Sequence, residues 1–240
     1  MIDISVVIPT YNRKDILLKT IKGLFEQTYP KDRFEIIIVD DGSTDGTEDY
    51  IVRVVRERPL PAIIYVKQAP YKKGPAAANN MGIKTASGKY ILMINDDIIP
   101  DKRLIEEHMK SHVRAVRERP QQKVIVQGRV INTSSMDDVT KGHKGYSGGY
   151  SDISFGYFTT WNLSIKRQSL IDGGLFDEEF RNLCWEDVEF GFRLRKMGIK
   201  QINNKNAIGY HFRHDFFMKD INKVKDKSIK MGQNAGIYYR

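Results

Sequence analysis

The sequence is almost free of cysteine, with Cys184 alone in 240 residues. One cysteine cannot build a disulfide framework or a cysteine-rich zinc cluster, so nothing requires an oxidising compartment and a cytoplasmic location is expected. Long apolar runs are also missing, because stretches such as 36–39 and 90–94 fall far below the roughly 18 to 20 residues that span a bilayer. The N-terminal apolar stretch meets Pro9 too early for a signal peptide. We therefore expect a protein that does not cross a membrane.

Acidic residues are the minority among the charged ones: 30 Asp and Glu stand against 39 Lys and Arg, which gives a net charge of +9. This excess favours acidic partners, namely nucleotides, nucleic acid or an anionic membrane surface. Neither zinc-finger spacing nor an aromatic RNP-like strand motif is present, so nucleic acid is not the expected partner. With 40% hydrophobic residues, the chain can bury one substantial core.

Short apolar runs alternate with helical patterns over the first two thirds of the chain. This order is typical of βαβ units and predicts an α/β fold with a mainly parallel sheet flanked by helices. We expect Asn12 to cap the first helix and Gly88 to close the alanine-rich helix. One domain over residues 1–214 and a basic, roughly helical tail over 215–240 are predicted. The expected strands are 5–9, 35–39, 62–66, 90–94, 123–131, 157–165, 199–203 and 207–212, and the later helices are 76–86, 101–118 and 185–197.

Two carboxylates and a Gly-Ser-Thr run follow the second predicted strand, at residues 40–45. One interpretation is a tight turn that caps a helix, for which Ser, Thr and Asp are the usual residues. The other is a carboxylate that accepts the imide N–H of a uracil base. The motif alone leaves both interpretations open.

A second pair of acids, Asp96 and Asp97, follows the apolar strand at 90–94. Ligands of open α/β sheets bind beyond the carboxyl ends of strands, which places this pair for binding. Adjacent carboxylates repel each other unless a cation lies beside them. Mg²⁺ or Mn²⁺ would suit them, because these ions combine one or two carboxylates with substrate phosphates and water. The alternative is a solvated turn.

Later residues add a candidate base and a candidate metal ligand. Asp187 opens a helix at 185–197, and a water-poor pocket there would raise the basicity of its carboxylate. Placement for the helix dipole is the alternative. His211 ends the predicted strand at 207–212, where its imidazole could join Asp97 in a manganese site or serve a structural purpose. The glycine-rich stretch 132–150 is expected to form a mobile loop near the site.

Four segments in this order carry a family resemblance. They are Val6-Val7-Ile8-Pro9-Thr10-Tyr11-Asn12-Arg13, Val39-Asp40-Asp41-Gly42-Ser43-Thr44-Asp45, Gly88-Lys89-Tyr90-Ile91-Leu92 leading to Asn95-Asp96-Asp97, and Glu186-Asp187. Together they resemble glycosyltransferase family 2 from residue 4 to about residue 212. The resemblance implies a GT-A fold with a small antiparallel element, a nucleotide-sugar donor with UDP-sugar favoured, a divalent metal and inversion at the anomeric carbon.

The resemblance also implies roles for individual residues. Asp97 matches the principal metal ligand, and Asp187 matches the catalytic base. Asn95 stands where the family often has the first acid of an Asp-x-Asp motif, and Asn79 where it often has an arginine. The expected donor-binding residues are Pro9, Thr10, Tyr11, Arg13, Asp40, Asp41, Gly74, Asn80 and Asp96.

The resulting hypothesis is an inverting glycosyltransferase whose acceptor is a glycan or a lipid-linked sugar. The tail at 215–240 is expected to hold it against the anionic inner face of a membrane. Three alternatives remain: a catalytically silent nucleotide-sugar or glycan-binding module, a membrane-surface adaptor, and a nucleotidyltransferase. The last is expected to carry a glycine-rich phosphate loop near the N-terminus, and the segment 9–13 has no glycine.

Overall fold

The structure is a computed structural model that describes most of the chain. The described residues are 1–57, 61–69, 74–133, 158–181 and 185–212, with 225–226, 228–229, 231–233 and 237 near the C-terminus. Residues 134–150 of the expected loop, and most of the expected tail, lie outside them. The predicted division at residue 214 therefore stays a prediction.

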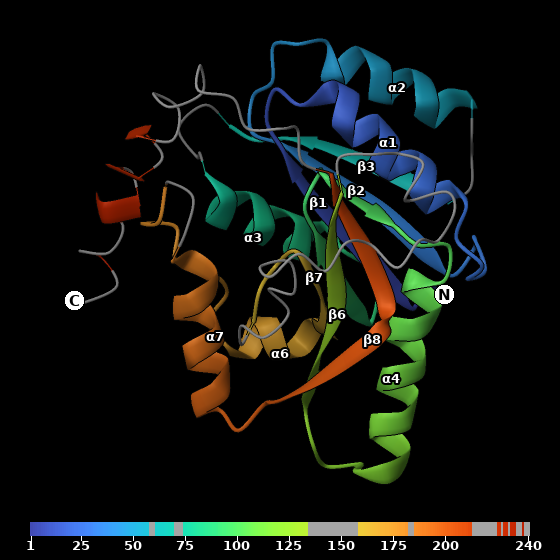
Figure 1. Cartoon of the computed structure of the whole chain (residues 1–240), viewed down its shortest axis with the longest axis vertical. Coiled ribbons are helices and arrows are strands. Elements are labelled where there is room, and N and C mark those ends of the chain that lie inside the picture. Colours follow the sequence, from blue (N-terminus) through green and yellow to red (C-terminus); the bar gives the residue numbers. More distant parts are fainter. Residues whose placement is uncertain are drawn as a thin grey trace.

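Within the described residues, eight strands form one mixed sheet in the order β3-β2-β1-β4-β7-β6-β8-β5 (Figure 1). Strands β3, β2, β1 and β4 run parallel, as the sequence predicts. The strands are β1 (Ile4–Thr10), β2 (Phe34–Asp40), β3 (Ala62–Lys67), β4 (Tyr90–Ile94), β5 (Ile98–Pro100), β6 (Val124–Thr133), β7 (Asn162–Lys166) and β8 (Lys200–Phe212).

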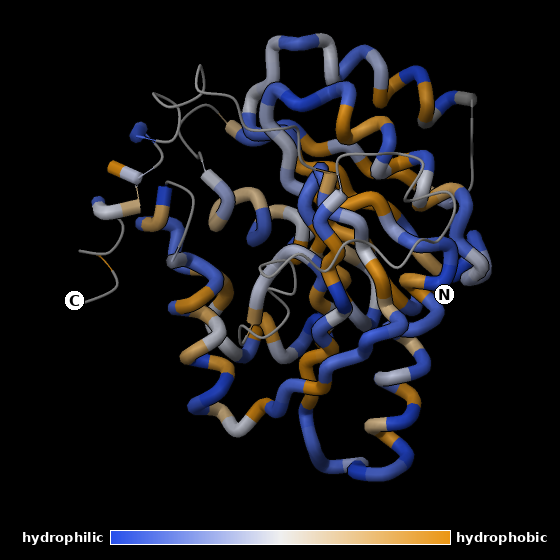
Figure 2. The backbone as a smooth tube through the Cα atoms, viewed as in Figure 1, coloured by the Kyte–Doolittle hydropathy of each residue, from blue (hydrophilic) through white to orange (hydrophobic). Residues whose placement is uncertain are grey.

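Helices cover both faces of the sheet because alternate side chains of each strand point to opposite faces (Figure 1). Ile8 of β1 packs on one face with α1 (Lys14–Phe25), α2 (Thr47–Glu57) and α4 (Leu104–Glu118). Val7 packs on the other with α3 (Pro75–Thr85), α6 (Arg167–Asp172) and α7 (Glu186–Lys196). Every residue of β2 and β4 is buried, which accounts for the apolar runs Ile36–Val39 and Tyr90–Ile94 and for the hydrophobic centre in Figure 2.

The second half of the sheet contains the antiparallel pairings. Strand β7 runs antiparallel to β4 and β6, and β8 lies between β6 and β5. The two short strands predicted at 199–203 and 207–212 are one strand, interrupted only by a register shift opposite Gly128 and Arg129. A strand was predicted at 157–165, and the structure has the shorter β7, which begins later, at Asn162.

Two predicted helix caps are wrong. Helix α1 begins after Arg13, and Asn12 instead accepts a hydrogen bond from the Thr44 amide at 2.7 Å. Helix α3 ends at Thr85, and Gly88 lies against β1, where an added Cβ would be 2.6 Å from the Ser5 hydroxyl oxygen. Both residues serve contacts between segments distant in sequence. The predicted end of α7 is confirmed, because Gly198 adopts a φ of +78° two residues after the helix.

Candidate active site

The two acids after β4 are buried at the carboxyl end of the parallel strands. Their side chains are only 6% and 9% exposed for Asp96 and Asp97. The Thr10 hydroxyl, at the end of neighbouring β1, donates to Asp96 Oδ2 at 2.9 Å, and the Thr20 hydroxyl of α1 donates to the Asp96 carbonyl at 2.8 Å. These bonds fix the pair where adjacent strands end.

Arg13 bridges the pair. Its Nη1 lies 2.9 Å from Asp96 Oδ1, and its Nη2 lies 2.8 Å from Asp97 Oδ2. The sequence argument required a cation beside these acids, and here the protein's own guanidinium takes that position. Arg13 was predicted to line the nucleotide pocket, but its contact with the carboxylates was not predicted.

His211 lies close to the same oxygen of Asp97 that Arg13 contacts. Strand β8 pairs with β5, and His211 Nε2 is 3.3 Å from Asp97 Oδ2. Its Nδ1 lies 2.8 Å from Asn132 Oδ1, an acceptor that favours a proton on Nδ1. With that proton on Nδ1, Nε2 is the ring nitrogen that faces the Asp97 carboxylate. The Trp161 ring packs on His211 with centroids 5.1 Å apart.

The second carboxylate oxygen of Asp97 bears on metal binding. Asp97 Oδ1 is buried and has no hydrogen-bond partner among the residues that the structure describes. A buried oxygen without a partner is costly unless a ligand completes it. Those same residues contain no cluster of three or more His, Cys, Asp or Glu side chains suited to a metal. Asp97 and His211 therefore fit a magnesium or manganese ion only if phosphates and water supply further ligands.

The two acids differ in their pKa. Burial raises the pKa of Asp96 to about 6, helped by the charge of Asp97 and opposed by Arg13. Burial would also raise the pKa of Asp97, but His211 and Arg13 outweigh it and hold that pKa below its usual range. Asp97 is therefore the stronger acid of the two, and both carboxyl groups are mainly ionised at pH 7.

The first acid pair, after β2, has different surroundings. Asp40 Oδ1 accepts the amides of Gly42 and Ser43 at 3.0 and 2.7 Å, and its Oδ2 accepts the Tyr65 hydroxyl at 2.6 Å. These contacts match the tight-turn interpretation of Asp40. Asp41 Oδ2 accepts the amide of Gly74 at the start of α3.

The remaining predicted donor-binding residues are placed differently from one another. Tyr11 is 53% exposed directly after β1, while Pro9 lies within that strand, opposite Val39. Gly74 has a φ of +105°, and a Cβ there would collide with the Arg181 backbone.

Asn80 is enclosed in α3. Its amide group donates to the Phe176 carbonyl at 2.9 Å and to Glu178 Oε1 at 3.0 Å, and its Oδ1 accepts the Phe176 amide at 2.9 Å. These bonds tie α3 to the segment before α7. The described contacts of Asn80 are therefore structural. Its neighbour Asn79 is also buried, and Asn79 Oδ1 has no partner among the described residues.

Asp187 lies half-buried in the first turn of α7. Its Oδ1 accepts the Val188 amide at 2.8 Å, and the Thr160 amide also donates to its carboxyl group. Burial raises the pKa of Asp187 despite these bonds. Thr160 directly precedes Trp161, whose ring packs on His211. The candidate base and the candidate metal ligand are thus anchored on consecutive residues.

Trp185 sets the direction in which α7 begins. It adopts the left-handed region with a φ of +77°, which is uncommon for a large side chain. Its indole N–H donates to the Met231 carbonyl at 3.2 Å, so the C-terminal segment contacts the start of the helix that carries Asp187.

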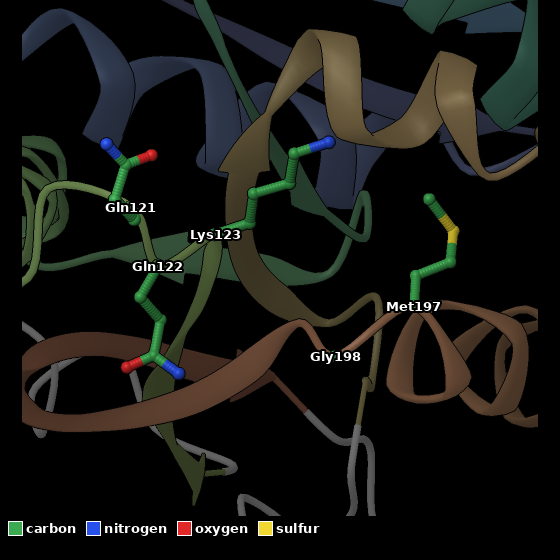
Figure 3. A pocket seen from close by; sticks show the side chains of 5 residues that line it. All are labelled: Gln121, Gln122, Lys123, Met197 and Gly198. Atoms are coloured by element: carbon green, nitrogen blue, oxygen red, sulfur yellow. The ribbon is translucent and has the colours of Figure 1, made fainter.

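A separate hollow of about 420 Å³ lies near the starts of β6 and β8 (Figure 3). Gln121, Gln122, Lys123, Met197 and Gly198 line it. Asn132 and His211 lie at the other ends of these two strands. The hollow is therefore not part of the carboxylate site.

Comparison with known proteins gives a family match. The model of the family described as "Glycosyl transferase family 2" matches residues 5–167. That span includes both acid pairs and Arg13, and it ends before Asp187 and His211. None of the helices in the described part of the chain is both long and apolar enough to cross a bilayer.

Two curated relatives match nearly the whole chain. The dolichyl N-acetyl-alpha-D-glucosaminyl phosphate 3-beta-D-2,3-diacetamido-2,3-dideoxy-beta-D-glucuronosyltransferase of Methanococcus voltae is 28% identical, over 99% of this chain and 74% of that protein. A chondroitin synthase of Escherichia coli is 29% identical over 99% of this chain. The match spans only 39% of that enzyme's length.

Two solved structures share the fold. S. aureus TarS 1–349 in complex with UDP-GlcNAc has a TM-score of 0.65 at 21% identity, over 90% of this chain and 60% of that one. The mannosyltransferase PcManGT from Pyrobaculum calidifontis, in complex with GDP-Man and Mn²⁺, has a TM-score of 0.62 at 20% identity. The match covers 86% of this chain and 56% of that one.

Proposed function

Because this chain belongs to glycosyltransferase family 2, we propose that it transfers a sugar from a nucleotide-diphosphate sugar to an acceptor hydroxyl, with inversion at the anomeric carbon. The observation that carries the proposal is the buried Asp96–Asp97 pair, in which Asp97, beside His211, keeps one oxygen that no described residue contacts by a hydrogen bond. A silent binding module would have no need of a positioned base such as Asp187.

The donor in this proposal is a UDP-sugar. TarS, which shares the fold, has been solved with UDP-GlcNAc, whereas PcManGT has been solved with GDP-Man. The name of the archaeal relative includes a dolichyl-linked sugar phosphate, which supports a glycan or lipid-linked acceptor. Tyr11, exposed after β1, is available to contact the nucleotide.

Asp97 and His211 would hold the divalent metal, with Asp96 beside them. Such an ion neutralises the negative charge that develops on a departing diphosphate. Asp97 Oδ1, which has no hydrogen-bond partner among the described residues, offers one hard oxygen ligand, and His211 Nε2 offers one imidazole ligand.

Asp187 acts as the general base in this scheme. It takes the proton of the acceptor hydroxyl while the acceptor oxygen bonds to the anomeric carbon. On the opposite side, the bond from that carbon to the diphosphate breaks, and its electron pair leaves with the diphosphate. Burial supports this assignment, because a raised pKa makes the ionised Asp187 carboxylate a stronger base.

The first test is thermal stability against UDP, GDP, dTDP and CDP sugars, each with Mn²⁺ and with a chelator. A ligand that binds only the folded state must raise stability. We expect a shift with one nucleotide class that shrinks with chelator, followed by nucleotide diphosphate release when acceptors are added. Binding without any release, across a broad acceptor panel, would instead favour the silent module.

A further inference from the structure

We propose that Arg13 is an exchangeable counter-ion for the Asp96–Asp97 pair. It neutralises the pair in the free protein and moves to the donor diphosphate when a divalent metal takes its place. Metal and donor would then bind as a mutually dependent pair. This inference rests on the proposed function, since it concerns the same donor and metal site.

The starting point is charge. Two adjacent carboxylates that are this deeply buried repel each other, and each loses hydration. The guanidinium of Arg13 reduces this repulsion and replaces part of the lost hydration, because it donates one hydrogen bond to Asp96 Oδ1 and one to Asp97 Oδ2. It therefore spans the pair instead of gripping one carboxylate with both nitrogens. A metal cation between the two carboxylates would likewise contact both of them.

The contacts leave the pair incompletely satisfied. The second oxygen of Asp96 accepts a hydrogen bond from Thr10, whereas the second oxygen of Asp97 has no partner in the described part of the chain. Arg13 brings one positive charge, and a divalent ion would bring two. A metal that bound Asp97 through the unpaired oxygen would gain a ligand that Arg13 does not use.

The three side chains differ in their freedom to move. The carboxylates of Asp96 and Asp97 are almost fully enclosed, and the Phe212 amide holds the Asp97 carbonyl at 3.0 Å. The Arg13 side chain is 46% exposed. Exchange would therefore move Arg13 and leave the acids in place.

Arg13 also has a suitable second partner in the proposed complex. It sits beside the acid pair, directly before α1, whose first amide, from Lys14, already donates to Asp45 Oδ2 at 2.8 Å. A guanidinium matches the oxygens of a phosphate as well as those of a carboxylate. A diphosphate bound there could receive the displaced Arg13 and add its own oxygens to the metal.

This exchange has a thermodynamic consequence. In the free protein the metal must compete with Arg13, so its affinity is low. UDP removes the competitor, so UDP and metal should each tighten the binding of the other by the same factor. Couplings of this kind are typically about 5- to 150-fold.

The test measures Mn²⁺ binding to the full chain, with and without UDP. Free Mn²⁺ is followed by electron paramagnetic resonance, and bound Mn²⁺ by quenching of the tryptophan fluorescence, to which Trp161 and Trp185 both contribute. We expect UDP to tighten Mn²⁺ binding to the wild type at least about fivefold. Arg13→Met should bind Mn²⁺ about 5- to 150-fold more tightly without UDP and lose most of the UDP effect.

Arg33→Met is the matched control, because Arg33 also pairs with an aspartate, Asp3. Asp3 directly precedes β1, whereas the acid pair lies near the other end of that strand. It should bind Mn²⁺ like the wild type. Asp97→Asn, added to Arg13→Met, should abolish the tight binding if the metal lies on the pair.

Two results would overturn the exchange, and they differ in whether they also contradict the proposed metal site. In the first, the wild type binds Mn²⁺ in the presence of UDP, but in the absence of UDP Arg13→Met binds Mn²⁺ no more tightly than the wild type does. Arg13 is then a fixed counter-ion, and the proposed enzyme stands. If no variant binds Mn²⁺ even with UDP, the metal site fails as well. Should Arg13→Met not fold, Arg13→Lys replaces it, since one ammonium group bridges the pair less well. Unchanged Mn²⁺ affinity in Arg13→Lys would equally reject the exchange.

Discussion

The acid pairs after β2 and after β4 look alike in sequence and differ in structure. Asp40 is the last residue of β2, Asp96 and Asp97 follow β4, and both of these buried strands flank β1. The oxygens of Asp40 are occupied by two turn amides and by Tyr65, whereas Asp97 keeps one oxygen unpartnered among the described residues and shares the other between Arg13 and His211. Whether an acid builds a turn or awaits a ligand is therefore decided by partners from elsewhere in the chain.

The largest effect is expected at a third acid, which belongs to neither pair. Asp187→Asn should lower kcat by about 10² to 10⁴, because a positioned base contributes that much to proton transfer. Binding of Mn²⁺ and UDP should not change. Steady-state kinetics and a binding titration together check this. Glu189→Gln, on the same helix and paired with Arg193, serves as the control and should keep the wild-type kcat. An Asp187→Asn enzyme with full turnover would remove Asp187 from the mechanism.

Removing a carboxylate from the second pair tests its metal role directly. Asp97→Asn should lower the transfer rate about 100-fold or more, since metal stabilisation of a leaving group is worth several kcal/mol and each 1.36 kcal/mol is tenfold. The Mn²⁺-dependent part of the thermal shift with UDP should vanish. A variant that keeps its metal dependence would show that the second pair, like Asp40, is structural.

Acid should destabilise the fold through two histidines outside both pairs. His108 and His112 of α4 are buried, each within 2.8 Å of the Ser164 hydroxyl, and His108 also lies 2.8 Å from Asn162. Burial lowers the pKa of His108 to about 4 and that of His112 to about 3. Tyr90 stacks on His112, and Glu107 is the charged neighbour of His108.

The sign of the pH dependence follows from these shifts. Below pH 6.5 the unfolded histidines bind protons and the folded ones do not, so stability falls by about 2 kcal/mol per histidine by pH 5. Asp96, whose pKa is raised to about 6, acts in the opposite direction and offsets about 1 kcal/mol. Urea unfolding at pH 7.5 and 5 measures the sum. A flat profile would contradict the prediction, and metal titrations of the acid pairs belong above pH 6.5.

The smallest effect should come from the first pair. Tyr65→Phe removes the donor to Asp40 Oδ2 and should lower the free energy of unfolding by about 1.5 to 3 kcal/mol, as is usual for a hydrogen bond to a charged group. Mn²⁺ affinity should stay at the wild-type value. A loss of metal binding in this variant, without a loss of stability, would erase the distinction between the pairs.

The sequence predicts the parallel half of this fold better than the rest. Unbroken apolar runs such as Ile36–Val39 and Tyr90–Ile94 place β2 and β4 within a residue or two, because burial on both faces leaves a strong signal. Asn12 was misjudged because its side chain reaches the turn after β2, a contact that local capping rules do not contain. Strand β8 was split because its middle, with Asn204 and Lys205, is polar at a bulge.

The site was predicted unevenly for the same reason. The proximity of Asp97 and His211 follows from strand ends meeting at one edge, which a pattern can indicate. Asn132, Thr160 and Trp161 were missed, because their places depend on how β6, β7 and β8 pair. The bridge from Arg13 to both acids depends on side-chain geometry, which no spacing rule supplies.

The insertion of β8 between β6 and β5 also orders events during synthesis. Asp97 and His211 are separated by 114 residues, and the strand that carries His211 enters the interior of the sheet. At about 5 to 20 residues per second, a ribosome needs roughly 6 to 23 seconds to make that interval. For that time a nascent chain holds Asp97 without its imidazole neighbour. The carboxylate site is therefore among the last parts of the protein to mature.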